Sequence, residues 1–124
     1  MTDGRLVLVA DDDDDILALV TAVLERSGHE VIAAHDGAEA LALAHRRRPD
    51  LAVLDIAMPE LDGLEVLRRL RMDTGTSDLP VVLLSARAQE TGVVRGFASG
   101  ASAYVRKPFS PRELIDRVTE LLGG

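Results

Sequence analysis

The 124-residue sequence predicts an α/β fold, a three-layer sandwich with helices on both faces of a five-stranded parallel sheet. Five short aliphatic runs alternate with stretches of helical period, and this alternation indicates successive β-α-β units. The runs at Leu51–Leu54 and Val81–Leu84 are apolar throughout rather than alternating with polar residues. Such continuous runs indicate strands buried on both faces, as in the middle of a parallel sheet.

The five aliphatic runs give the expected strands. In chain order these are Leu6–Ala10, Glu30–Ala34, Leu51–Asp55, Val81–Ser85 and Ala103–Arg106. Each is four or five residues long, which is an ordinary length for a strand. The stretches between them are long enough for the crossover helices that parallel strands require.

Capping sequences mark where most of the helices begin. Asp36-Gly-Ala-Glu39 and Asp62-Gly-Leu-Glu65 resemble capping boxes, and they predict helices over Gly37–Arg47 and from Asp62 to about Met72. Ser110-Pro-Arg-Glu113 predicts the last helix, with proline at its first position. The first helix follows the aspartate run and ends before Gly28, where a left-handed cap is expected. A fourth helix is expected over about Glu90–Ser99.

Apolar residues at helical spacing define the faces expected to point inward. In the first helix these are Ile16, Leu19, Val20, Val23 and Leu24. In the second helix they are Leu41 and Ala44. In the fourth they are Val93, Val94 and Phe97, and in the last they are Leu114, Ile115, Val118, Leu121 and Leu122.

Composition limits the class of protein. Hydrophobic residues make up 47% of the chain, too many for a disordered protein, and only three residues are aromatic, so we expect an aliphatic core. The chain has no cysteine, which excludes disulfides and thiolate zinc sites. We expect residues 1–124 to form one domain, with its core at about 5–122 and no effector domain. No apolar run approaches a membrane span of roughly 20 residues, and the N-terminus lacks a signal-peptide core, so a cytoplasmic protein is expected.

The net charge of −7 disfavours nonspecific binding to nucleic acid, which depends largely on Lys and Arg. The basic block Arg46–Arg48 is explained by its place at a helix C-terminus, where cations complement the helix dipole. We therefore expect neither direct nucleic-acid binding nor membrane association.

Polar residues stand where four of the expected strands end. These are Asp11 and Asp12 after the first, Asp55 at the end of the third, Ser85 at the end of the fourth and Lys107 after the fifth. Because the carboxyl ends of parallel strands share one edge of the sheet, we expect these side chains to surround one cleft. Two carboxylates about 4 Å apart repel by up to about 4 kcal/mol at an effective dielectric of about 20. A proton, Lys107 or a divalent cation must offset this repulsion.

The residue types at these strand ends fit phosphoryl transfer. Oxygen ligands with neither thiolate nor histidine suit Mg²⁺ or Mn²⁺ rather than zinc. Phosphoryl transfer needs a nucleophile, cations around the equatorial oxygens and hydrogen-bond donors. Asp55 can be the nucleophile, the metal and Lys107 can supply positive charge, and Ser85 can donate a hydrogen bond.

The chain resembles the receiver domains of bacterial two-component response regulators. Four motifs in order carry the resemblance: Leu8-Val-Ala-Asp11-Asp12-Asp13, Leu54-Asp55-Ile-Ala-Met58-Pro59-Glu-Leu-Asp62-Gly63, Leu84-Ser85-Ala86 and Gly100-Ala-Ser-Ala-Tyr104-Val-Arg-Lys107-Pro108-Phe109. It implies a flavodoxin-like sheet with strand order 2-1-3-4-5. It also implies a switch that accepts phosphoryl groups from the phosphohistidine of a histidine kinase or a histidine phosphotransfer protein. Such a domain assists its own phosphorylation and dephosphorylation but is not otherwise an enzyme.

The resemblance assigns a role to each site residue. Asp55 would be the phosphoacceptor; Asp12, Asp55 and the backbone carbonyl of Ala57 would bind the metal directly, and Asp11 would bind it through water. Ser85, Ala86 and Lys107 would bind the phosphoryl group, with Lys107 paired with Asp55 beforehand. Ser85 and Tyr104 would form the switch, acting on an unknown target through the surface of helix four, strand five and helix five. The Lys107–Pro108 bond is expected to be cis.

Three positions depart from the family pattern. Ala57 has no polar side chain to orient or block water, and Arg87 could reach the phosphoryl group or remain solvated; in the family these two positions tune phosphoryl lifetime. Asp14 stands where proline is frequent, and we interpret it as a solvated carboxylate near a helix N-terminus.

Other functional classes remain open. A haloacid-dehalogenase-like phosphatase also uses a strand-end aspartate and Mg²⁺, but that family would place a second acid where Ala57 stands. A flavodoxin-like flavin binder should offer amides to a phosphate after the first strand, where this chain has five aspartates. A receiver-shaped interaction module that is not phosphorylated is disfavoured by the presence of Asp11, Asp12, Asp55, Ser85 and Lys107.

Overall fold

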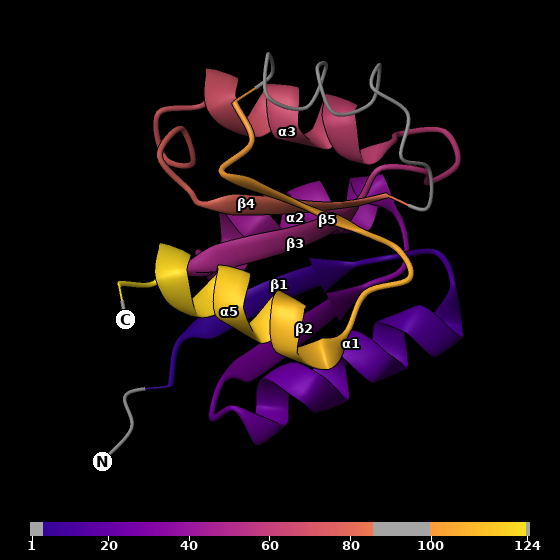
Figure 1. The fold of residues 1–124 in the computed structure, drawn as a ribbon. Helices are drawn as coiled ribbons and strands as arrows, with labels where there is room; N and C mark the ends of the chain where they lie inside the picture. The colour runs from indigo at the N-terminus through magenta and orange to yellow at the C-terminus, as the bar shows by residue number, and fades with distance from the viewer. Residues whose placement is uncertain (1–3, 86–99, 124) are drawn as a thin grey trace.

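The computed structural model describes residues 4–85 and 100–123. Five parallel strands form one sheet in the order β2-β1-β3-β4-β5 (Figure 1), which confirms the predicted fold class and strand order. The strands are β1 (Leu6–Ala10), β2 (Glu30–Ala34), β3 (Leu51–Asp55), β4 (Val81–Ser85) and β5 (Ala103–Arg106). Their bounds are those expected from the aliphatic runs.

Helices cover both faces of the sheet. They are α1 (Asp14–Arg26), α2 (Gly37–Arg47), α3 (Gly63–Met72) and α5 (Pro111–Leu121). α1 and α5 lie on one face, and α2 and α3 lie on the other (Figure 1). The helix expected over Glu90–Ser99 falls outside the described residues. Within the described ranges, no helix is long and apolar enough to cross a membrane.

Each described helix begins at a short acceptor side chain, which satisfies backbone N–H groups that have no partner within the helix. The Asp36 and Asp62 carboxylates accept from the N–H groups of Glu39 and Glu65, each at 2.8 Å. Ser110 Oγ accepts from the N–H of Glu113 at 3.1 Å. The predicted N-caps of α2, α3 and α5 are therefore confirmed.

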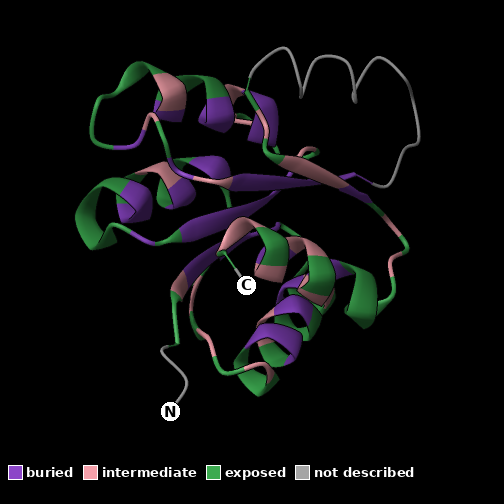
Figure 2. Cartoon of the chain, turned by 60° about the vertical axis from the view of Figure 1, so that its left-hand side comes forward, coloured by how far each residue is buried: buried purple, intermediate pink, exposed green. Residues whose placement is uncertain are grey.

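The core is aliphatic and lies on both sides of the sheet. All residues of β3 and β4 are buried (Figure 2), because these strands are central and covered by helices on each face. One cluster joins the sheet to α2 and α3, and the other joins it to α1 and α5. β3, which ends in Asp55, is therefore buried along its whole length.

The inward face of α1 was predicted partly wrongly. Leu19 is 43% exposed, whereas Leu17 is buried against the sheet together with Val20 and Leu24. Apolar residues spread over more than half the circumference of this helix, so their period does not fix which stripe faces inward. In α2 the prediction holds for Ala44, which is buried, while Leu41 is half-buried at the rim of the core.

Candidate functional site

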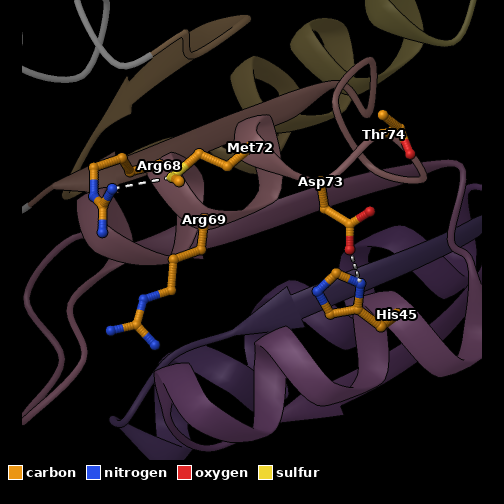
Figure 3. Close-up of a pocket in the computed structure, with 6 residues that line it drawn as sticks. All are labelled: His45, Arg68, Arg69, Met72, Asp73 and Thr74. Carbon is orange, nitrogen blue, oxygen red and sulfur yellow. Dashed lines mark hydrogen bonds and ion pairs between the residues drawn. The ribbon is translucent and has the colours of Figure 1, made fainter.

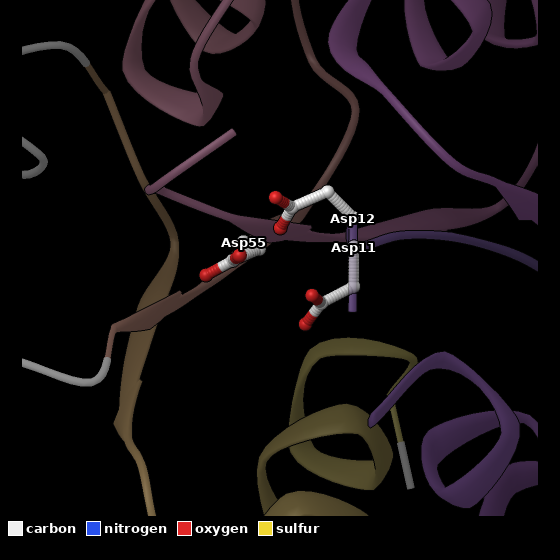
Figure 4. A group of neighbouring side chains, drawn as sticks. All are labelled: Asp11, Asp12 and Asp55. Carbon is white, nitrogen blue, oxygen red and sulfur yellow. The ribbon is translucent and has the colours of Figure 1, made fainter. Parts of the chain in front are cut away.

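Three carboxylates meet where β1 and β3 end. Asp11, Asp12 and Asp55 each offer a carboxylate oxygen, and these atoms lie within 4.8 Å of one another (Figure 4). β1 and β3 are neighbours in the sheet, with Ala10 opposite Leu54, so the residues that follow emerge side by side. Asp11 and Asp55 are buried, whereas Asp12 is exposed. The cluster is thus open to solvent at Asp12 and closed at its base.

Lys107 compensates the charge of the buried acids. Its Nζ lies 2.9 Å from Asp11 Oδ2 and 3.3 Å from Asp55 Oδ1, and its side chain is 14% exposed. The Lys107 N–H donates to the carbonyl of Ser85 at 2.7 Å, which holds the end of β5 against β4. The Lys107–Pro108 peptide bond is cis, as the family resemblance implied. The pairing with Asp55 was expected; the shorter contact with Asp11 was not.

Asp11 is fixed by both of its oxygens. While Oδ2 accepts from Lys107, Oδ1 accepts from the N–H of Asp13 at 2.9 Å. The Asp13 carboxylate in turn caps α1 by accepting from Asp15 and Ile16. Asp11 therefore links the start of α1 to Lys107, which follows the distant strand β5, and Asp13 acts as the N-cap of α1.

The pKa of Asp55 is raised from its ordinary value of 3.8 to about 6, chiefly by burial. The neighbouring charge of Asp11 contributes to this rise, and the ammonium of Lys107 only partly offsets the two effects. The pKa of Lys107 is raised: burial lowers it, but the hydrogen bond to Asp11 and the charge of Asp55 outweigh that burial. The site thus favours a cation near Asp55 and disfavours uncompensated negative charge.

Of the other predicted site residues, Ser85 and Tyr104 lie within the part of the chain that the structure describes. Ser85 is 8% exposed at the end of β4, next to Arg106 in the sheet. Tyr104 lies in β5 opposite Leu83 and packs half-buried against the core on the α2–α3 side. Ala86 and Arg87 fall outside the described residues.

Residues 56–62, here called the β3–α3 loop, turn sharply after Asp55. The Ile56 N–H donates to Leu84 O, and Ile56 O accepts from the N–H groups of Met58 and Gly63. A Cβ on Gly63 would lie 2.3 Å from the Asp55 carbonyl oxygen, so only glycine permits this closure. Ala57 is exposed at the turn. The loop therefore exposes Ala57 two residues after the buried Asp55.

One feature of this loop was not predicted. Glu60 has φ +66°, a left-handed conformation that side chains other than Gly, Asn and Asp adopt infrequently. Neither Pro59 nor Leu61 gives a sequence signal for it, because positive φ is normally anticipated at glycine.

The donor set fits a small divalent cation. Three carboxylates and one ammonium leave a formal excess of negative charge, and all the acidic ligands are oxygens. Magnesium commonly takes one or two carboxylates and completes its octahedron with water and phosphate oxygens. The exposed side chain of Asp12 leaves one side of the cluster open to such ligands.

Comparison with known proteins assigns the family. The family model described as "Response regulator receiver domain" matches residues 7–119. The chain belongs to the response regulator receiver family. The alkaline phosphatase synthesis transcriptional regulatory protein PhoP of Bacillus subtilis is 46% identical to this receiver over 119 residues. That match covers 96% of the receiver but 49% of PhoP, so the chain spans about half the length of this relative.

Solved structures agree with this assignment. A putative response regulator from Chloroflexus aurantiacus is 34% identical with a TM-score of 0.94, over 98% of this receiver and 100% of that chain. The receiver domain of the sensor histidine kinase PA1611 from Pseudomonas aeruginosa is 27% identical with a TM-score of 0.91, over 98% of this receiver and 99% of that chain. The latter structure has a magnesium ion coordinated in its active-site cleft.

The receiver also has a groove of about 670 Å³ at the C-terminal ends of α2 and α3 (Figure 3), and its lining includes none of the three clustered aspartates. His45 Nδ1 lies 3.2 Å from Asp73 Oδ2 across this groove. On α3, Glu65 pairs with both Arg68 and Arg69. Its charged groups are largely paired with one another, so the groove lacks the uncompensated charge that marks the acidic cluster.

Proposed function

We propose that this receiver is a phosphorylation-dependent switch that accepts a phosphoryl group on Asp55 from a phosphohistidine, with Mg²⁺ as cofactor. One observation supports this above the rest: Lys107 reaches across the sheet to within 3.3 Å of Asp55 and 2.9 Å of Asp11. A nucleophilic carboxylate, a cluster of acidic ligands and a cation for phosphoryl oxygens are thereby collected in one cleft.

In the proposed reaction, an ionised Asp55 oxygen attacks the phosphorus of the phosphohistidine in line with the P–N bond. The new O–P bond forms as the P–N bond breaks, and the imidazole nitrogen keeps the bonding electron pair and is protonated. With a pKa of about 6, most Asp55 carboxylates are ionised and nucleophilic near pH 7. Lys107 neutralises charge on the phosphoryl oxygens and holds them in the cleft.

The proposed metal ligands are the carboxylates of Asp12 and Asp55 and the backbone carbonyl of Ala57, with Asp11 binding through water. When bound, Mg²⁺ supplies positive charge that neutralises the phosphoryl oxygens during transfer. The buried residue Asp11 keeps Lys107 in place through the 2.9 Å contact, so the lysine stays in the cleft before the phosphoryl group arrives.

We propose Ser85 and Ala86 as further phosphoryl-binding residues and Ser85 with Tyr104 as the switch pair. A phosphoryl group adds about −1.5 to −2 charges and three strong acceptors, which can draw the Ser85 hydroxyl toward Asp55. Ser85 is in β4 beside β3, and Tyr104 is in the adjacent strand β5, so a change at Asp55 has a short path to the surface near β5 and α5. Ala57 and Arg87 are the proposed tuners of phosphoryl lifetime.

The proposed partners follow from this chemistry. The phosphoryl donor is a histidine kinase or a histidine phosphotransfer protein, and the output passes to a downstream protein. The relative PhoP is described as a transcriptional regulatory protein. We propose that any nucleic-acid binding in a comparable assembly belongs to another domain, since this receiver carries a net charge of −7.

Intact-mass measurement after incubation with acetyl phosphate and Mg²⁺ tests the proposal. We expect the protein to gain the mass of one phosphoryl group, and we expect Asp55→Asn to gain none. Equal gain by both proteins would refute Asp55 as the acceptor. No gain by the parent protein, and no binding of beryllofluoride, would favour an interaction module that is not phosphorylated. Continuous hydrolysis of phosphoesters would favour a phosphatase.

A further inference from the structure

The first residue of α2, Gly37, packs closely against the β3–α3 loop. Gly37 is buried, and a Cβ at this position would lie 2.1 Å from the carbonyl oxygen of Leu61 and 3.0 Å from its Cβ. Real Cβ atoms do not approach an oxygen this closely, so the approach requires glycine. The Cα hydrogen in place of the side chain points toward this oxygen, as in a weak Cα–H···O contact.

The start of α2 is fixed by its own cap, and its inward face is packed against the sheet. Asp36 caps the helix by accepting from Glu39 N–H at 2.8 Å, and the Glu39 carboxylate accepts from His35 N–H at 2.7 Å. Ala40 and Ala44, on the inward face, are fully buried against the sheet. We therefore expect a group added at the start of α2 to displace the loop more than the helix.

The loop is in a conformation that needs such support. Glu60 has φ +66°, and the N–H of Leu61 donates to the carbonyl of Pro59 at 2.7 Å, closing a three-residue turn. Turns of this kind with positive φ are rare and strained, and they persist only where the surroundings fix them. Gly37 contacts the loop directly after this turn, at Leu61.

The same loop contains Ala57, between Ile56 and Met58. The Met58 N–H donates to Ile56 O at 3.0 Å, so the backbone on both sides of Ala57 belongs to a second tight turn. Two tight turns within seven residues leave the backbone little freedom to adjust, so a displacement of Leu61 also displaces Ala57.

We propose that Gly37 is a positioning residue that sets the place of the Ala57 carbonyl and thereby the affinity for Mg²⁺. This inference rests on the proposed function, in which the Ala57 carbonyl binds the metal. Gly37 itself lies in another element and offers no side chain to the metal. It contributes by letting the start of α2 approach the β3–α3 loop closely, because glycine has no side chain.

The test compares Gly37→Ala with Ala38→Gly, which changes the exposed neighbouring residue of α2 without adding a group that faces the loop. Amide NMR spectra of the metal-free proteins should show displaced resonances for Ala57 and Leu61 only in Gly37→Ala. Titration with MgCl₂, followed through the same amides, should show a Kd at least about tenfold higher for Gly37→Ala, as is typical when support of a metal ligand is lost. Ala38→Gly should stay within about twofold of the parent.

A second variant guards against simple misfolding. Glu60→Gly removes the strain at positive φ, and in the Gly37→Ala background it should let Leu61 move without displacing Ala57, recovering much of the Mg²⁺ affinity. Unchanged Mg²⁺ affinity in Gly37→Ala, equal weakening by Ala38→Gly, or no recovery in the double variant would overturn the inference. If the parent itself bound no Mg²⁺, the proposed function would fail, and the metal-free spectra would still decide whether Gly37 positions the loop.

Discussion

Replacing Asp55 by asparagine should stabilise the metal-free protein at neutral pH. The rise in the pKa of Asp55 from 3.8 to about 6 means that the folded state holds this proton more tightly than the unfolded chain does. Ionising Asp55 in the fold therefore opposes folding, by about 3 kcal/mol when the carboxylate is fully charged. The asparagine side chain has nearly the same shape, is always neutral and avoids this penalty.

Because the pKa of Asp55 is raised in the folded state, the stability difference between the two proteins depends on pH. For a raised acid pKa, the parent loses stability as pH rises through the window from about 4 to about 6, whereas Asp55→Asn does not. The advantage of the variant should thus be about 3 kcal/mol at pH 7.5 and about 1 kcal/mol at pH 4.5. At pH 7.5 this corresponds to a Tm about 10 °C higher.

Urea unfolding in EDTA at the two pH values measures both quantities. Asp13→Asn is a matched control, because it removes an exposed carboxylate two residues from Asp11 while keeping a good helix cap. Its free energy of unfolding should change by less than about 0.5 kcal/mol. Mg²⁺ at a hundredfold over its Kd should stabilise the parent by about 2.7 kcal/mol and remove most of the advantage. An Asp55→Asn protein no more stable than the parent at pH 7.5, or an advantage independent of pH, would refute the electrostatic reasoning.

Three further predictions concern single contacts in the structure. Lys107→Ala should lower the free energy of unfolding at pH 7.5 by about 3 kcal/mol or more, because it leaves Asp11 and Asp55 buried without a cation. Lys107→Arg is the control, and urea unfolding measures the stability of both variants. Ser110→Ala should lower stability by about 1 kcal/mol in the same assay through loss of the α5 cap, with Ser110→Asn close to the parent; equal losses in both would contradict the capping role. Gly63→Ala should lower the Tm, with a loss of about 2 kcal/mol or more, because its Cβ would meet the Asp55 carbonyl at 2.3 Å; an unchanged Tm would show that the loop can relax.

The sequence predicted the strands and caps well because each depends on local chemistry. A run such as Leu51–Leu54 has few alternatives to a buried strand, and Asp36 or Asp62 three residues before a glutamate marks a helix start. The sequence did not determine which face of α1 points inward, because Leu17 and Leu19 are equally apolar. Only the packing of the helix on the sheet decides which of the two is buried.

The meeting of Asp11, Asp12 and Asp55 could be predicted because parallel topology brings strand ends together. Which of these aspartates pairs most closely with Lys107 could not be predicted from the sequence. That Lys107 lies closer to Asp11 than to Asp55 depends on side-chain geometry across the sheet. The left-handed backbone at Glu60 is likewise set by tertiary support rather than by the residue itself.

The ammonium group in the cleft comes from a residue 96 positions away from its closest acidic partner. Until the fifth strand has joined its neighbour, the aspartates at the ends of the first and third strands lack this ammonium group. A polypeptide truncated ahead of that strand would carry the buried carboxylates without their counter-ion. The charge balance of this cleft is therefore a property of the assembled sheet, and β5 completes it.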